Sequence, residues 1–306
     1  MNYQDIEQLM KKINVDSAEG NIHPRVQQVV LRLVTDLCKA IEDLDIQPSE
    51  FWQGLEYFGD AAQANELGLI AGGLGIEHFL DLRADEADEK AGLTGGTPRT
   101  IEGPLYVAGA PESVGFARMD DGSESEFMDT LIIEGKVTDT EGHLIPNAKV
   151  ELWHANSLGT YSFFDKAQSE FNLRRTIFTN ENGQYTAQTT MPVGYGCPPD
   201  GPTQGLLNLL GRHGNRPSHV HYFISAPGYR KLTTQFNIEG DQYLWDDFAF
   251  ATRHGLVATA VDCNDVNQME RFGLEKPFKH IQFDIQLMKA TEQAPSIEVQ
   301  RRHLVV

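Results

Sequence analysis

The segment Leu131-Ile132-Ile133-Glu134-Gly135-Lys136-Val137 has the composition of a β-strand, and a polar turn, residues 138–142, separates it from a second apolar run, residues 148–153. The same order of strand, polar turn and strand recurs in residues 176–190, where Asn182-Gly183 marks the turn. Turn residues recur at intervals of about eight to twelve positions through this part of the chain, which is typical of sandwiches and barrels. The sequence therefore predicts an antiparallel β domain.

Helical periodicity precedes this domain. Apolar residues from Val26 to Leu44 recur at i, i+3, i+4 and i+7, which predicts an amphipathic helix with Pro24 in its first turn. Pro48-Ser49-Glu50 begins a second helical run, and a third extends from Glu66 to Leu82. The N-terminal part of the chain is therefore expected to be helical.

The two regions meet at a polar, acidic connector, residues 85–96. We divide the chain accordingly into a helical region, residues 1–96, and a β-sandwich domain, residues 97–306. The expected fold class is α+β and mainly β, with helices at the N-terminus and an antiparallel β-sandwich at the C-terminus.

The composition of the 306-residue chain limits its partners and its location. Hydrophobic residues make up 40%, which is enough for one large or two ordinary domains. Acidic residues outnumber basic ones 44 to 25 and give a net charge of −19, so nucleic acid is not expected as a partner. Three separated cysteines, Cys38, Cys197 and Cys263, form no disulfide framework, and the N-terminus lacks a signal-peptide pattern. We expect a soluble, cytoplasmic protein.

A His-x-His pattern lies in residues 215–225, which have the composition of a strand. The period of two in a strand places His219 and His221 on one face, a short distance apart, and Val220 on the other. Two neutral imidazoles on one face often supply half of a site for iron, zinc, copper or nickel. The alternative is a pair of solvated histidines, but burying two imidazoles is costly without a metal ion or hydrogen-bond partners.

The other ligands of such a site are not acids or cysteines close in sequence, because the next acidic residue after the pattern is Glu239. Two tyrosines are candidates instead. Tyr195 lies between Gly194 and Gly196, where few neighbouring side chains are available for packing, and Tyr161 follows a strand. Tyr161 also has an ordinary alternative role as a core aromatic residue.

Four motifs together resemble the intradiol ring-cleaving dioxygenases, and within them the catechol 1,2-dioxygenase group, over nearly the whole chain. The motifs are Thr97-Pro98-Arg99-Thr100-Ile101-Glu102-Gly103-Pro104-Leu105-Tyr106, Val150-Glu151-Leu152-Trp153-His154-Ala155-Asn156 leading to Gly159-Thr160-Tyr161, Gly194-Tyr195-Gly196-Cys197, and Arg216-Pro217-Ser218-His219-Val220-His221. The resemblance implies one ferric ion, Fe(3+), per chain, held by Tyr161, Tyr195, His219 and His221. It also implies a homodimer formed through the N-terminal helices, with a bound phospholipid at the dimer interface, and a sandwich that carries the site.

The implied reaction is the cleavage of catechol by O2 between its two hydroxylated carbons, which gives cis,cis-muconate in the degradation of aromatic compounds. Ferric iron is a hard cation whose charge two phenolates and a hydroxide neutralise. By resemblance, Tyr195 leaves the iron when catechol binds, and Tyr161 stays bound. Arg216 and Gln235 are expected to stabilise negative charge on the substrate.

The same resemblance assigns an apolar pocket wall to Leu69, Gly72, Ile101, Pro104, Cys197 and Phe248. Gly72 departs from the family pattern, because many relatives carry a larger residue at this position. Cys197 is not expected to act as a nucleophile, since no basic environment is apparent around it. His154 is not a ligand in the family pattern and is interpreted as structural.

Two alternatives are kept. Residues 135–150 and 181–185 also resemble transthyretin-like modules, which are not enzymes and only bind other molecules or act as spacers. Such a module leaves the two tyrosines and two histidines unexplained. The other alternative is a related enzyme that prefers a substituted diol, such as a chlorocatechol, hydroxyquinol or protocatechuate. Protocatechuate enzymes typically pair two different chains, whereas the helical region favours the catechol type. A binding module is expected to be colourless, and the enzymes wine-red.

Overall fold

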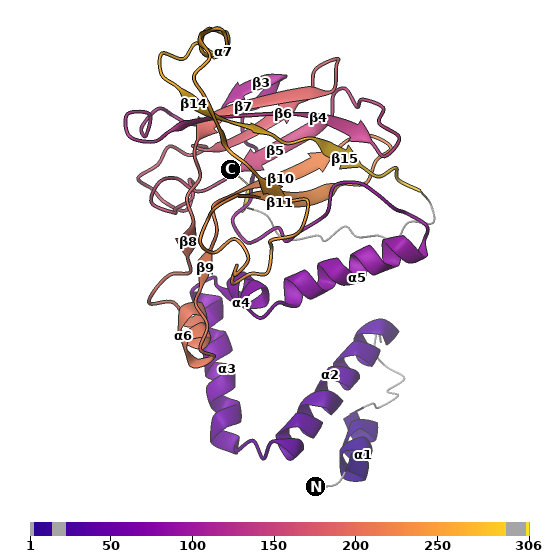
Figure 1. The fold of residues 1–306 in the computed structure, drawn as a ribbon. Coiled ribbons are helices and arrows are strands. Elements are labelled where there is room, and N and C mark those ends of the chain that lie inside the picture. Colours follow the sequence, from indigo (N-terminus) through magenta and orange to yellow (C-terminus); the bar gives the residue numbers. More distant parts are fainter. Residues whose placement is uncertain (1–2, 14–22, 292–303, 306) are drawn as a thin grey trace. The chain divides into compact units, whose positions relative to one another are not determined.

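The computed structural model describes residues 3–13, 23–291 and 304–305 (Figure 1). The chain divides into two compact units, Met1–Ala64 and Asn65–Val306. The first unit is helical, and the second contains further helices and the β-sheets. The expected combination of N-terminal helices with a mainly β domain is therefore confirmed.

The described part of the first unit contains α1 (Tyr3–Ile13), α2 (Pro24–Asp43) and α3 (Pro48–Gln63). A proline occupies the first turn of both α2 and α3, where its missing N–H costs no hydrogen bond. A capping box closes the start of α3, in which the backbone N–H of Gln47 donates to Glu50 Oε2 over 2.8 Å. The helices predicted around Val26 and Pro48 are confirmed, whereas α1, which packs against α2, was not anticipated.

The second unit contains α4 (Leu67–Gly73), α5 (Ile76–Lys90), α6 (Pro202–Leu209) and α7 (Val266–Phe272). Gly75, with a φ of +74°, divides the third predicted helical run into α4 and α5. The predicted connector is wrong at its start, because α5 continues to Lys90. The acidic residues Asp85 and Asp88 pair with arginines of the β domain instead of belonging to a solvated linker. Within the described ranges, no helix has the length and apolar character needed to cross a membrane.

Two six-stranded sheets form the β domain. The first contains, in spatial order, β12 (Val257–Ala258), β11 (Leu232–Ile238), β10 (His219–Ser225), β5 (Lys149–Trp153), β6 (Arg174–Phe178) and β2 (Glu112–Val114). The second contains β13 (Val261–Cys263), β14 (Phe278–Gln282), β4 (Thr130–Asp139), β7 (Gln184–Thr190) and β3 (Phe116–Arg118), with β15 (Ile285–Leu287) also paired to β4. Two short pairs join β1 (Val107–Ala108) to β16 (Leu304–Val305) and β8 (Tyr195–Gly196) to β9 (Asn215–Arg216).

Antiparallel pairs, as predicted, include β5–β10, β10–β11 and β4–β7, whereas β14 pairs with β4 in parallel in the middle of the second sheet. Parallel pairs at the edges, such as β2–β6 and β3–β7, were not indicated by the sequence. The two strand–turn–strand units are not hairpins, because β4 and β5, and likewise β6 and β7, lie in different sheets. Each polar turn therefore carries the chain from one layer of the sandwich to the other.

The main hydrophobic core is made of buried side chains from strands of both sheets. Val220, Tyr222 and Ile224 of β10 belong to this core and are fully buried. His219 and His221 alternate with them and therefore lie on the opposite face of the strand. This face of the first sheet carries the candidate site.

Candidate metal centre

Four side-chain donors gather on the face of the first sheet that is turned away from the core. Tyr161 Oη lies 3.1 Å from Tyr195 Oη, which lies 3.4 Å from His219 Nε2. His219 Nε2 in turn lies 3.1 Å from His221 Nε2. The structure thus brings together the four residues expected as ligands, although they belong to three separate segments of the chain.

The backbone fixes the tautomer of His219. Its Nδ1 donates to the carbonyl oxygen of Pro217 over 2.6 Å, so its Nε2 carries a lone pair. Burial, and then the neighbouring cation of Arg216, lower the pKa of His219 well below its ordinary value. The imidazole is therefore neutral at pH 7, which is the form that binds metal ions.

The indole of Trp153 orients His221. The two rings stack with their centroids 4.9 Å apart and an angle of 4° between their planes. Burial, and then His219, lower the pKa of His221 well below its ordinary value. Its Nδ1 is buried and has no hydrogen-bond partner within the described residues, while its Nε2 faces His219. The ring nitrogen of His221 that faces the other three donor side chains is therefore Nε2.

The two tyrosines occupy different environments. Tyr161 is only 3% exposed, whereas Tyr195 borders a cavity of about 380 Å³. Burial raises the pKa of Tyr161 well above its ordinary value. Burial also raises the pKa of Tyr195, although the cation of Arg216 acts in the opposite sense. Both phenols therefore need a further positive charge nearby in order to ionise at neutral pH.

A glycine allows the two tyrosine-bearing loops to approach each other. Gly159 has a φ of +74°, and a Cβ at this position would lie 2.6 Å from the Cβ of Tyr195. Any other residue at Gly159 would therefore clash with Tyr195, so the position of Tyr195 depends on this glycine.

The spacing and the chemistry of the four donors fit a single metal ion. First-row metals bind nitrogen and oxygen ligands at about 2.0–2.2 Å, so adjacent ligands of one ion lie about 3 Å apart. The measured separations of 3.1 and 3.4 Å match this spacing. Phenol oxygens and imidazole nitrogens suit iron, and a ferric ion supplies the positive charge that two phenolates require.

Arg216 lies beside the donors in a buried hydrogen-bond network. Its Nη1 lies 3.0 Å from His219 Nε2, and its Nη2 donates to Gln235 Oε1 over 2.9 Å. Gln235 is fully buried and donates from Nε2 to Asn237 Oδ1 over 2.6 Å. The structure therefore places both Arg216 and Gln235 next to the site, with orientations fixed by neighbouring side chains.

Sequence reasoning missed Asp247, the counter-ion of Arg216. Its carboxylate accepts hydrogen bonds of 3.2 Å from both Nε and Nη2 of the guanidinium. It also accepts from the backbone N–H groups of Ala249 and Ala251. Burial alone lowers the pKa of Arg216, but the Asp247 carboxylate raises it above its ordinary value. The local signal for Asp247 is weak: it directly precedes Phe248, which was assigned to the pocket wall.

Most of the predicted pocket wall lies in one apolar cluster. Leu69 of α4 packs against buried residues that include Ile101, Cys197 and Phe248. Burial raises the pKa of the Cys197 thiol to about 12, so this cysteine contributes apolar surface and not a thiolate nucleophile.

The other two predicted wall residues touch the same helix or belong to it. Gly72 is buried in α4, and a Cβ there would lie 3.7 Å from the Cβ of Ala249, an ordinary contact distance. Pro104 is exposed, and its Cβ lies 3.2 Å from the place of a Cβ on Gly68. The structure therefore gathers all six residues around α4.

His154 lies near the site but has its own partners. Its Nδ1 contacts the carbonyl oxygen of Ala155 and its Nε2 contacts Thr189 Oγ1, each over 2.7 Å. Burial lowers the pKa of His154 to about 4. Both ring nitrogens are therefore engaged within the fold, in agreement with a structural role.

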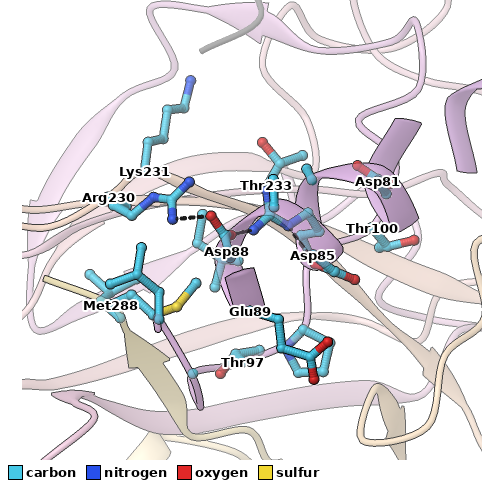
Figure 2. Close-up of a pocket in the computed structure, with 18 of the residues that line it drawn as sticks. Asp81, Asp85, Asp88, Glu89, Thr97, Thr100, Arg230, Lys231, Thr233 and Met288 are labelled. Atoms are coloured by element: carbon cyan, nitrogen blue, oxygen red, sulfur yellow. Dashed lines mark hydrogen bonds and ion pairs between the residues drawn. The ribbon is translucent and has the colours of Figure 1, made fainter. Parts of the chain in front are cut away.

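A separate cavity of about 1170 Å³ lies beside α5 (Figure 2). Paired charges line it: Asp88 binds both Arg99 and Arg230, and Asp85 binds Arg99. None of the four donor residues lines this cavity. It is therefore distinct from the candidate metal centre.

Comparisons with known proteins point to one enzyme family. A family model described as "Dioxygenase" matches residues 101–289, and one described as "Catechol dioxygenase N terminus" matches residues 23–92. A catechol 1,2-dioxygenase from Acinetobacter guillouiae is 72% identical, over 96% of this chain and 97% of that protein. The crystal structure of wild-type catechol 1,2-dioxygenase from Acinetobacter radioresistens superposes with a TM-score of 0.97 at 74% identity, covering 100% of this chain and 99% of the other.

Dioxygenases with other named substrates are more distant. A chlorocatechol 1,2-dioxygenase from Cupriavidus pinatubonensis is 30% identical over 77% of this chain and 89% of that protein. The extent of the match to both family models, together with the identity to the catechol enzymes, decides the assignment. The chain belongs to the intradiol dioxygenases, oxidoreductases that include the catechol 1,2-dioxygenases.

Proposed function

We propose that this chain cleaves catechol with O2 between the two hydroxylated carbons and forms cis,cis-muconate, both atoms of O2 entering the product. The observation that supports this proposal is the gathering of two phenols and two imidazoles within 3.1 to 3.4 Å of their neighbours. We propose that Tyr161, Tyr195, His219 and His221 hold one ferric ion per chain. When bound, this ion supplies Lewis acidity for a catecholate and the redox capacity that ring cleavage with O2 requires.

The two tyrosines are proposed to have unequal roles. Tyr195 is partly exposed, whereas Tyr161 is buried. We assign to Tyr195 Oη the acceptance of a proton from a catechol hydroxyl. Tyr161 is assigned the role of a ligand that keeps its position.

Arg216 and Gln235 are proposed to face the substrate. The guanidinium lies beside the donors, and Asp247 and Gln235 restrict its orientation. A fixed cation at this place stabilises negative charge that develops on the ring without reorganisation during the reaction. Leu69, Gly72, Ile101, Pro104, Cys197 and Phe248 are proposed to form the apolar wall that positions the ring.

A homodimer formed through the N-terminal helices is also proposed. α2 has no fully buried residue, and apolar side chains such as Leu33 and Leu37 are exposed. A stripe of this kind suits a second copy of the same helices. Size-exclusion chromatography with light scattering tests the dimer, and lipid extraction with mass spectrometry tests a bound phospholipid. The boundary at residue 96 and the cytoplasmic location stay predictions from the sequence.

One set of assays tests the proposed reaction. Purified protein is loaded with iron, and oxygen uptake and muconate formation are followed with catechol, 4-chlorocatechol, hydroxyquinol and protocatechuate. We expect turnover of catechol with one iron per chain. The variant His221→Ala should lose iron and activity, whereas His143→Ala, at a position that is 70% exposed, should retain both. Stoichiometric zinc in active protein, or absence of ring cleavage with every diol, overturns the proposal.

A further inference from the structure

The C-terminal end of α4 is capped by a residue from outside the helix. Carbonyl oxygens at the end of a helix have no partner within it. Arg212 donates from Nη1 to one of them, the carbonyl oxygen of Gly73, and from Nη2 to the carbonyl oxygen of Phe248 over 3.0 Å. One guanidinium therefore joins α4 to the segment that carries Phe248 of the predicted pocket wall.

Arg212 is itself fixed in place. The guanidinium carbon lies 4.6 Å from the centre of the Phe250 ring, a cation–π contact. Its backbone N–H donates to the carbonyl oxygen of Leu207 over 2.8 Å, and Gly211, with a φ of +68°, closes α6 just before it. The main chain of Arg212 thus belongs to the end of α6, and its side chain reaches the end of α4.

The beginning of α4 is also joined to α6. Glu66 directly precedes α4 and is buried, and its Oε2 accepts a hydrogen bond from the backbone N–H of Thr203 over 2.9 Å. This N–H lies in the first turn of α6, where Gly201 at the N-cap offers no side chain of its own. The two helices are therefore linked at both ends.

Close packing connects this pair of helices to the pocket wall. A Cβ on Gly73 would lie 3.3 Å from the Phe248 ring and 3.6 Å from Leu207. Leu69, in the middle of α4, packs against the cluster that contains both Phe248 and Leu207. A small displacement of α4 therefore changes the space beside Phe248 without altering the contacts among the four donors.

We propose that Arg212 is a positioning residue that holds α4 against Phe248 and so sets the discrimination between catechol and ring-substituted catechols. The inference rests on the proposed function, because it takes α4 to face the substrate. A guanidinium suits the role, since its rigid fork donates to two carbonyl oxygens at once, whereas a lysine ammonium is a single point of contact.

The experiment compares Arg212→Gln with the matched control Arg271→Gln in the iron-loaded protein. Arg271 on α7 also stacks on a ring, with its guanidinium carbon 4.7 Å from the centre of Phe272, and it pairs with Glu134. In Arg212→Gln we expect the KM for catechol to rise about three- to tenfold and the preference for catechol over 4-chlorocatechol to fall by a similar factor. The kcat for catechol, the iron content and the charge-transfer band should stay within about twofold of wild type, and Arg271→Gln should change none of these quantities.

Hydrogen exchange gives a readout that needs no substrate. In Arg212→Gln, the amides of residues 67–74 should lose protection, while those of β10 keep it. Arg212→Lys should show an intermediate loss, and it replaces Arg212→Gln in all measurements if the glutamine variant does not fold. Unchanged substrate preference and unchanged exchange in α4 overturn the proposal, as does an equal loss of kcat and of the charge-transfer band. If wild-type protein forms no muconate, the proposed function fails instead, and the exchange data still decide whether Arg212 holds α4.

Discussion

Asp247 holds Arg216 through two hydrogen bonds of 3.2 Å, and both side chains are buried. A buried guanidinium that loses its counter-ion is left as an uncompensated charge in the interior. The carboxylate is itself held by two backbone N–H groups, so the main chain fixes the counter-ion that orients Arg216 beside the four donors.

We therefore predict that Asp247→Asn lowers the free energy of unfolding by about 3–5 kcal/mol, because it leaves Arg216 unpaired. The same change should reduce kcat/KM for catechol by about 100-fold, since the cation no longer has a fixed orientation. Urea denaturation and steady-state oxygen uptake measure the two effects. Asp246→Asn is the control, because this neighbouring carboxylate is 82% exposed and pairs only with His213 among the described residues. Equal effects of the two substitutions contradict the prediction.

Substitution of the two tyrosines is predicted to have unequal effects. Tyr195→Phe should keep part of the iron and of the colour but lose most of the turnover, because the proposed acceptor of the catechol proton is gone. Tyr161→Phe should remove more of the charge-transfer band that persists in the anaerobic complex with catechol. Visible spectra recorded with and without substrate, together with iron analysis, make the comparison. Small and equal losses of activity in both variants rule out the ligand assignment.

A prediction on selectivity concerns Gly72 and Leu69, which lie three residues apart on α4. An alanine at position 72 meets Ala249 at an ordinary contact distance, so Gly72→Ala should fold and gain up to about 1 kcal/mol of helix stability. The added methyl group narrows the pocket, and kcat/KM for 4-chlorocatechol relative to catechol should fall by about tenfold. Leu69→Ala should raise the same ratio. If both variants keep the wild-type ratio, this face of α4 does not line the pocket.

The stability of the protein should depend on pH through the carboxyl group of Asp81 on α5 (Figure 2). Burial, and then the carboxylate of Glu77, raise the pKa of Asp81 to about 7, although Arg99 and Arg253 act in the opposite sense. The folded state therefore binds a proton at Asp81 more tightly than the unfolded state does. The free energy of unfolding consequently falls as the pH rises from about 4 to about 7.

Asp81→Asn should accordingly raise Tm at pH 8 relative to wild type and bring little change at pH 4. Calorimetry at both pH values measures the difference. Glu89→Gln, at an exposed position of the same helix, serves as the control and should show no such pH dependence. A constant offset between Asp81→Asn and wild type across the pH range would falsify the assignment.

Features that depend on local periodicity were predictable from the sequence. The period of two in β10 placed His219 and His221 on one face, and the spacing of apolar residues located α2. Bringing Tyr161 and Tyr195 to the same place required the family resemblance, because no local pattern relates two loops 34 residues apart.

Features that depend on tertiary pairing were not predictable. Asp247 meets Arg216 only after the chain has passed through β10 and β11, so no spacing rule relates the two residues. The sequence predicts a connector where α5 in fact continues, because acidic residues such as Asp88 are typical of a solvated linker. Asp88 instead pairs with Arg99 and Arg230, and no local pattern indicates these two contacts. The polar turns likewise gave no indication of whether the strands they join share a sheet.

Because side chains alternate along β10, the packing of the core and the placing of the two histidines both depend on the same strand register. If one residue is inserted directly before His219, then in the original pairing the imidazoles turn toward the interior of the sandwich and the aliphatic side chains toward the donors. Such a change abolishes both the interior packing and the ligand pair, so no intermediate sequence keeps one while it loses the other. Length variation among descendants of this chain should therefore avoid residues 219–225 and accumulate at exposed turns such as residues 140–143.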